Sequence, residues 1–222
     1  MRNLIKMQLN YKRFFCYVLG IFLFSMGAKF FIDSELGVDP LDSMVIGISN
    51  HLNCKIGTVS GAIAIFFLAI WSIWNKKRPI ITPFITMSAV GYLIDLWNYL
   101  DLLKSFSETN DYVLMIAGLL VCSYASALII MSGIGIRTMD LVAITMTHKI
   151  KIPFTISKGI IEVFFIASGI LTEGPFGIGT FAFLALVGPL IQPFIYLNKI
   201  LLNLKDYGLE QRVEASLEEQ YT

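Results

Sequence analysis

Long apolar stretches separated by short charged segments form the pattern of this chain. Several stretches reach the roughly 20 residues that a helix needs to cross a hydrocarbon core of about 30 Å. The pattern predicts spans at about 14–32, 57–74, 79–99, 112–132, 155–172 and 177–198. Pro189 and Pro193 predict a kink in the last of them, because proline disturbs the helix interior. The sequence therefore predicts an all-α polytopic membrane protein with six transmembrane helices.

Two further apolar segments are shorter than these spans. They read LDSMVIGISNHL over 41–52 and MDLVAITMTHKI over 139–150. If both crossed the bilayer, the chain would have eight spans and its two halves would run in parallel. If both enter the membrane part-way or lie at its surface, six spans remain, three in each half. The choice between these topologies decides the architecture of the chain.

An internal repeat links the two short segments. The chain aligns with itself at an offset of 98 residues, and the matched residues include glycines, aspartates and a pair of phenylalanines. The matches include Gly20 with Gly118, Gly37 with Gly135, Asp42 with Asp140, and Phe66 and Phe67 with Phe164 and Phe165. A repeat of this length indicates two structurally equivalent halves.

Lysine and arginine mark the loops expected in the cytoplasm. Basic residues lie in the N-terminal stretch, in 75–79 and in the tail, whereas the loop 33–42 is acidic and is expected outside. Eight spans would place 75–79 outside, against the positive-inside rule. Six spans restore the charge pattern and invert the second half relative to the first. Both termini are then cytoplasmic, and the protein belongs in the inner (cytoplasmic) cell membrane.

This reading divides the chain into five segments. They are a cytoplasmic N-terminal leader (1–13), a first membrane repeat (14–100), an extracytoplasmic linker (101–111), a second membrane repeat (112–198) and a cytoplasmic tail (199–222). Each repeat is expected to hold one short re-entrant or interfacial helix.

The composition is that of a membrane protein and gives no indication of nucleic-acid or metal binding. Of 222 residues, 56% are hydrophobic and 15% are charged, and the mean hydropathy is +0.71. The net charge of +1, without a basic stripe, does not predict nucleic-acid binding. The three cysteines have neither CxxC nor Cys/His spacing, so no metal or other cofactor is expected. The lipid bilayer and a small solute are the expected partners, and a homodimer is compatible with a chain of this size.

Inverted repeats with interrupted helices are typical of secondary transporters, whose sites lie at the repeat interface near the bilayer midplane. A helix that begins inside the membrane presents unpaired N–H groups and a partial positive charge that hydrocarbon cannot satisfy. The predicted helix-start motif consists of Gly37, Asp39 and Pro40, with Gly135 in the second half. Glycine and proline allow a sharp turn into a helix, and an aspartate follows where each short helix begins.

The GVDPLD sequence and the later GIGTFAFLALVGPLIQPF sequence (177–194) resemble the YczE/YyaS/YitT family of bacterial membrane proteins. The resemblance covers roughly 14–198 and implies a polytopic membrane protein. It implies no established biochemical activity. The second half departs from the motif, because Arg137 and Thr138 stand where Asp39 and Pro40 stand in the first half.

Five ionisable residues are candidates for a solute or ion pathway. Asp42 and Asp140 occupy equivalent helix starts, although both could be ordinary N-caps worth about 1 kcal/mol each. Lys158 and Glu162 share a helical face and could form a proton or cation relay. They could equally form a structural pair, with Lys158 reaching to the cytoplasmic surface. Arg137 could attract an anion beside Asp140 or serve as a positive-inside anchor.

Lys29 and Asp95 lie toward the outer ends of their spans. They could pair across the bundle or reach the membrane interface separately. Three classes of function remain open: a small secondary transporter, which the inverted repeat favours; a membrane accessory or regulatory protein that transports nothing; and an intramembrane enzyme. No HExxH or Gly-x-Ser-x-Gly motif occurs, so an enzyme is not expected.

Overall fold

The computed structural model describes residues 11–79, 81–100, 110–135 and 137–201. Within these residues all regular secondary structure is helical. The helices are α1 (Tyr11–Asp33), α2 (Pro40–Leu52), α3 (Ile56–Asn75), α4 (Thr82–Leu100), α6 (Asp111–Ser132), α7 (Thr138–Ile150), α8 (Phe154–Leu171) and α9 (Ile178–Leu201). The predicted all-helical class is confirmed. Most of the predicted leader, linker and tail lies outside the described residues.

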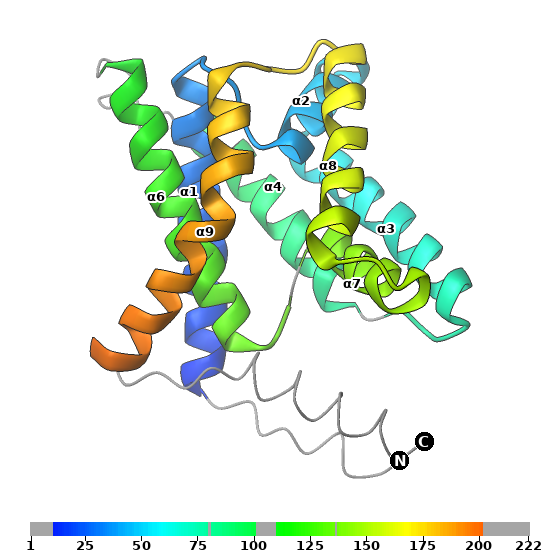
Figure 1. The fold of residues 1–222 in the computed structure, drawn as a ribbon. Coiled ribbons are helices and arrows are strands. Elements are labelled where there is room, and N and C mark those ends of the chain that lie inside the picture. The colour runs from blue at the N-terminus through cyan, green and yellow to red at the C-terminus, as the bar shows by residue number, and fades with distance from the viewer. Residues whose placement is uncertain (1–10, 80, 101–109, 136, 202–222) are drawn as a thin grey trace.

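The helices follow the predicted pattern closely. Each of the six predicted spans coincides with a helix to within three residues at either end, and α2 and α7 are the two short helices, with 13 residues each. By length and composition, α1, α3, α6 and α9 are apolar and long enough to cross a membrane. Helix α9 contains Pro189 and Pro193, and Figure 1 shows it bending along its length, as these prolines predict.

The equivalent helices α1 and α6 pack against each other and run in opposite directions (Figure 1). Arg13, at the start of α1, donates from Nε to the carbonyl oxygen of Ser132, at the end of α6, over 2.9 Å. Further along, a Cβ at Gly27 would lie 3.0 Å from the backbone nitrogen of Cys122. Glycine therefore permits a close antiparallel approach of the two helices. Arg13 also caps the carbonyl end of α6, where a cation is favourable.

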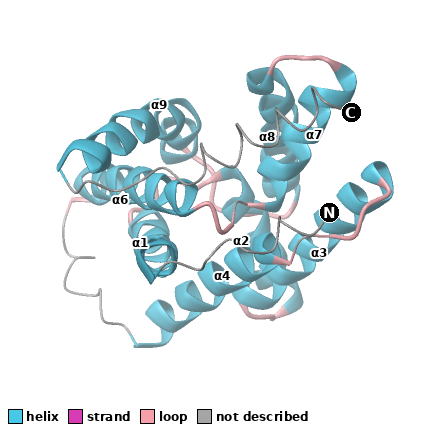
Figure 2. Cartoon of the chain, turned by 90° about the horizontal axis from the view of Figure 1, so that it is seen from below, coloured by secondary structure: helices cyan, strands magenta, loops and turns pink. Residues whose placement is uncertain are grey.

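The helices form two packing groups (Figure 2). In the α1 group, α1 contacts α4 and α6, and α6 contacts α9; in the α2 group, α2 and α7 pack on α8 and on α3. Each group has its own buried core. The α1 group encloses Phe24, Phe31, Cys122 and Phe183 among others, whereas the α2 group encloses residues of its own four helices together with Met87 of α4.

Helices α3 and α4 join the two groups. A Cβ at Gly91 of α4 would lie 2.7 Å from the Cα atom of Gly57 in α3, so both backbones need glycine there. Asp95 of α4 accepts hydrogen bonds from the N–H groups of Ile56 at 3.0 Å and Gly57 at 2.8 Å. The carboxylate satisfies two of the donors left open at the start of α3. Gly57, Gly91 and Asp95 together are called the α3–α4 contact below.

The possible pairing of Lys29 with Asp95 is not present. Lys29 is ion-paired with Asp33, one turn further along α1, and Asp95 caps α3 instead. The i,i+4 spacing brings Lys29 and Asp33 together on one face of α1. Their side chains are only 12% and 11% exposed, so this pair is largely enclosed by the protein.

Candidate functional site

Helix α2 begins with the predicted motif. Gly37 has φ +105°, a backbone conformation that favours glycine, and a Cβ there would lie 2.5 Å from the backbone nitrogen of Gly177. Asp39 is the N-cap, and its Oδ1 accepts from the N–H of Leu41 over 3.3 Å. Pro40 occupies the first helical position, where its fixed φ suits the helix and its missing N–H costs nothing. These residues place a carboxylate at the start of α2.

Helix α7 begins differently. Its N-cap is Arg137, whose side chain makes no capping hydrogen bond. Asp42 and Asp140 both lie in the first turn of their helices. The interpretation of these two aspartates as N-caps is therefore wrong, because Asp39 and Arg137 hold the N-cap positions. A first-turn carboxylate still interacts favourably with the positive end of the helix dipole.

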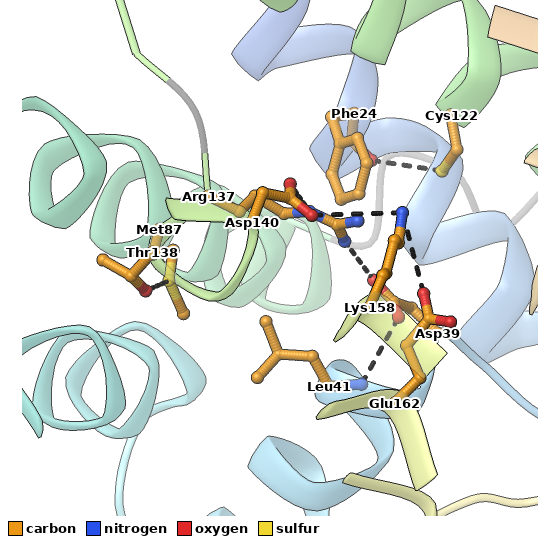
Figure 3. A network of polar contacts seen from close by, with 10 residues as sticks. All are labelled: Phe24, Asp39, Leu41, Met87, Cys122, Arg137, Thr138, Asp140, Lys158 and Glu162. Carbon is orange, nitrogen blue, oxygen red and sulfur yellow. Dashed lines mark hydrogen bonds and ion pairs between the residues drawn. The ribbon is translucent and has the colours of Figure 1, made fainter. Parts of the chain in front are cut away.

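The starts of both short helices meet at a cluster of charged side chains (Figure 3). Arg137 Nη1 lies 2.5 Å from Asp39 Oδ2, and its Nε lies 3.5 Å from Asp140 Oδ2. Lys158 Nζ, on α8, lies 3.9 Å from Asp140 Oδ1 and 3.7 Å from Glu162 Oε1. We call Asp39, Arg137, Asp140, Lys158 and Glu162 the charge cluster.

The charge cluster lies at the level of the middle of the long helices. The Arg137 guanidinium lies 5.6 Å from the centroid of the Phe24 ring, which comes from the middle of α1. Cys122, in the middle of α6, lies beside Phe24, because its Sγ is 3.7 Å from the Phe24 carbonyl oxygen (Figure 3). The Asp39 side chain is 5% exposed, whereas that of Lys158 is 29% exposed. The cluster is thus enclosed on the side of α1 and α6 and more open near α8.

Asp42 adds a further carboxyl group near the cluster. It is partly buried and interacts electrostatically with Asp39 and Arg137. With Asp42 included, four carboxylates face two cationic side chains. Buried charges without compensation are costly. When every group is ionised, this site therefore favours the uptake of a proton or another cation.

The structure brings all five predicted pathway residues to one region and places the helix-start motif beside them. Gly135 approaches α4, because a Cβ there would lie 2.6 Å from Thr86 Oγ1. The contact between Asp39 and Arg137 was not predicted. Its signal in the sequence was the opposite charge at two positions that the repeat makes equivalent. Among the described residues, no group of three or more His, Cys, Asp or Glu side chains could hold a metal ion.

Four apolar helices of spanning length and relatives that include a membrane protein make this chain an all-helical membrane protein. It belongs to the family of unknown function DUF6198, which matches residues 11–196. The chain is 25% identical to the uncharacterized protein YyaS of Bacillus subtilis (strain 168), over 82% of this chain and 92% of the relative. It is 23% identical to the uncharacterized membrane protein YczE of the same organism, over 90% and 91%.

These relatives confirm the resemblance to the YczE/YyaS family. No solved structure matches the chain significantly.

Proposed function

We propose that this protein is a small secondary transporter that moves a small polar or charged solute between two inverted halves. The observation that carries the proposal is the charge cluster, where the starts of α2 and α7 meet at the level of the middle of α1 and α6. Paired short helices that begin at mid-membrane depth are a recurring way to build a transport site. Asp42, the charge cluster and the two helix starts would line the pathway.

The proposed architecture has six spans, an inverted second half and cytoplasmic termini. The antiparallel packing of the equivalent helices α1 and α6 supports inversion, because parallel halves would carry equivalent helices in the same direction. The acidic loop 33–42 and the basic segment 75–79 support the orientation. The cell membrane is the proposed location.

Ionisable side chains inside a membrane are costly and commonly mark ion and substrate pathways. Here the carboxylates outnumber the cations, which favours a proton or another small cation as the coupling ion. Lys158 and Glu162 belong to α8, and Lys158, with 29% of its side chain exposed, is the most open residue of the cluster. They would exchange this ion with water, whereas Asp39 and Arg137 would hold the helix starts in place.

A membrane accessory protein that transports nothing is the second candidate. The close pairing of Arg137 with Asp39 favours it, because a structural network also neutralises its own charges. In that case the cluster would hold the two halves together and bind no solute. Catalysis is not part of either proposal. A homodimer remains a prediction.

The deciding test is flux in proteoliposomes that contain the purified full-length protein. Proton flux and the flux of a panel of small ions, amines and amino acids are measured for the wild type, Glu162→Gln and the double variant Asp42→Asn/Asp140→Asn. We expect flux in the wild type and background flux in both variants. Asp33→Asn, which alters the separate pair on α1, is the matched control and should retain flux.

Size-exclusion chromatography and circular dichroism confirm that each variant is folded. If no gradient and no solute in the panel gives flux in the wild type, while the cluster variants unfold at lower temperature, the accessory-protein function replaces the transporter.

A further inference from the structure

The residues of the α3–α4 contact have no counterparts in the second half. At the offset of 98 residues, Gly57, Gly91 and Asp95 correspond to Thr155, Pro189 and Pro193. Threonine and proline are bulkier than glycine, and proline offers no carboxylate to cap a helix. None of the contacts that bring α3 and α4 together can form in the same way between α8 and α9. In the described part of the chain, α8 and α9 have no extensive packing contact, and they lie apart in Figures 1 and 2.

One pair of equivalent glycines and a further glycine of α9 show the same asymmetry. A Cβ at Gly61 of α3 would lie 3.0 Å from Ser88 Oγ of α4. The equivalent Gly159 of α8 has no heavy atom within 4 Å of its Cβ position, and the same holds for Gly188 of α9. Helix α9 is also the least enclosed of the four spanning helices, with 28% of its apolar window buried against 50–56% in the others.

The two packing groups are therefore attached to each other mainly on the side of α4. Besides the α3–α4 contact, Thr138 at the start of α7 contacts Met87 of α4. On the side of α9, the N–H of Gly179 donates to the carbonyl of Leu36 over 2.7 Å. That bond joins α9 to the loop before α2 and not to α8. The two cores share no buried residue and touch each other at few side chains: Met87 of α4 lies in the core of the α2 group, and Ile46 of α2 packs against the core of the α1 group.

From this asymmetry we infer that the α2 group moves as one body against the α1 group, with the α3–α4 contact as the hinge and the α8–α9 side as the part that opens. The charge cluster belongs to the α2 group, because its side chains come from the starts of α2 and α7 and from α8. Phe24 belongs to the α1 group and covers Arg137. The movement would separate these two side chains and change how the cluster is exposed. The role of this movement in transport rests on the proposed function, whereas the inference that the movement occurs does not.

The test is a comparison of two spin-labelled pairs by double electron–electron resonance in full-length protein reconstituted in lipid nanodiscs. A background with Cys16→Ala, Cys54→Ser and Cys122→Ala removes the native thiols. Val163→Cys with Leu184→Cys reports on α8 and α9. The matched control, Ile65→Cys with Ile85→Cys, reports on α3 and α4. All four labelled positions are exposed, and Ile65 is the repeat equivalent of Val163.

We expect the α8–α9 distances to be broad or two-peaked, with a width at least about twice that of the α3–α4 distances. Gly91→Val, which crowds Gly57, should broaden the α3–α4 distances and confirm that the control pair can detect a loosened hinge. Equally narrow distributions for both pairs would overturn the inference, and so would a broad α3–α4 distribution in the background protein. Movement without flux in proteoliposomes would overturn the proposed function and leave this inference standing.

Discussion

Asp39 and Arg137 are equivalent residues of the two halves, 98 positions apart, and their side chains meet at 2.5 Å. Equivalent residues of two related halves can touch only close to the axis that relates them. Identical charges at such a position would repel each other at short range. The change from Asp39 in the first half to Arg137 in the second therefore turns a repulsive contact into an ion pair. This explains why the helix-start motif is not repeated in full.

A double-mutant cycle tests this pair. Arg137→Gln leaves the Asp39 carboxylate without its cation and Asp140 with Lys158 alone, so we expect it to lower the free energy of unfolding by about 3–5 kcal/mol. Asp39→Asn keeps a side-chain oxygen for capping α2. The double variant should be less destabilised than the sum of the single variants, with a coupling of about 1–3 kcal/mol.

Unfolding is followed by circular dichroism during titration of detergent-solubilised protein with a denaturing detergent. Lys29→Met, in the separate pair with Asp33, serves as a control and should show no coupling to Asp39→Asn. Additive effects of Asp39→Asn and Arg137→Gln would contradict the explanation that these two residues form a stabilising ion pair at the axis between the halves.

Only part of the cluster could be predicted from the sequence. Helical spacing places Lys158 and Glu162 on one face, and it brings Arg137 close to Asp140 because they are three residues apart. These contacts join residues that are close in the sequence, so helical spacing is enough to predict them. The contact between Asp39 and Arg137 depends on how the starts of two distant helices meet. Hydrophobic periodicity gives no information about how these two helix starts are placed relative to each other.

At the scale of helices, the sequence predicts the bounds well because glycine, proline and charged residues mark them. Helix α7 begins at Thr138, one residue before the predicted short segment, and α2 begins at Pro40. The packing partners of the helices were beyond prediction. The role of Asp95 shows the reason: its two hydrogen bonds reach a helix that starts 39 residues earlier in the chain.

The space around each glycine distinguishes close helix contacts from open helix surfaces. At Gly91 a Cβ would lie 2.7 Å from the Gly57 Cα atom, whereas at Gly188 a Cβ would meet no atom within 4 Å. We expect Gly91→Ala to destabilise the protein by about 1–3 kcal/mol, because backbone atoms must move apart. Gly188→Ala is the matched control and should be neutral or stabilising by up to about 1 kcal/mol, since alanine favours the helix.

Thermal unfolding of both variants, monitored by tryptophan fluorescence in the same detergent, provides the comparison. A loss of stability in Gly188→Ala equal to that in Gly91→Ala would show that α9 has a close partner on this face, contrary to the structure.

At the scale of the whole molecule, one symmetry argument connects the repeat, the topology and the site. Equivalent helices that run antiparallel, as α1 and α6 do, require the second half to be inverted if both helices cross the bilayer. Inversion requires an odd number of spans in each half, so in the proposed six-span architecture α2 and α7 would return to the side from which they entered. In that architecture the starts of these two helices would come from opposite sides of the membrane and meet near its middle, at the charge cluster.

The position of Cys54 tests this topology in the unmodified protein. Cys54 lies between α2 and α3 and is exposed, whereas Cys16 and Cys122 are buried. If α2 returns to the outer side, a membrane-impermeant maleimide should label Cys54 in intact cells, and Cys54→Ser should abolish the labelling. If α2 crosses the membrane, the same thiol faces the cytoplasm and is labelled only after the cells are permeabilised. Labelling restricted to permeabilised cells would therefore favour eight spans and parallel halves, and it would remove the basis for a site at mid-membrane depth.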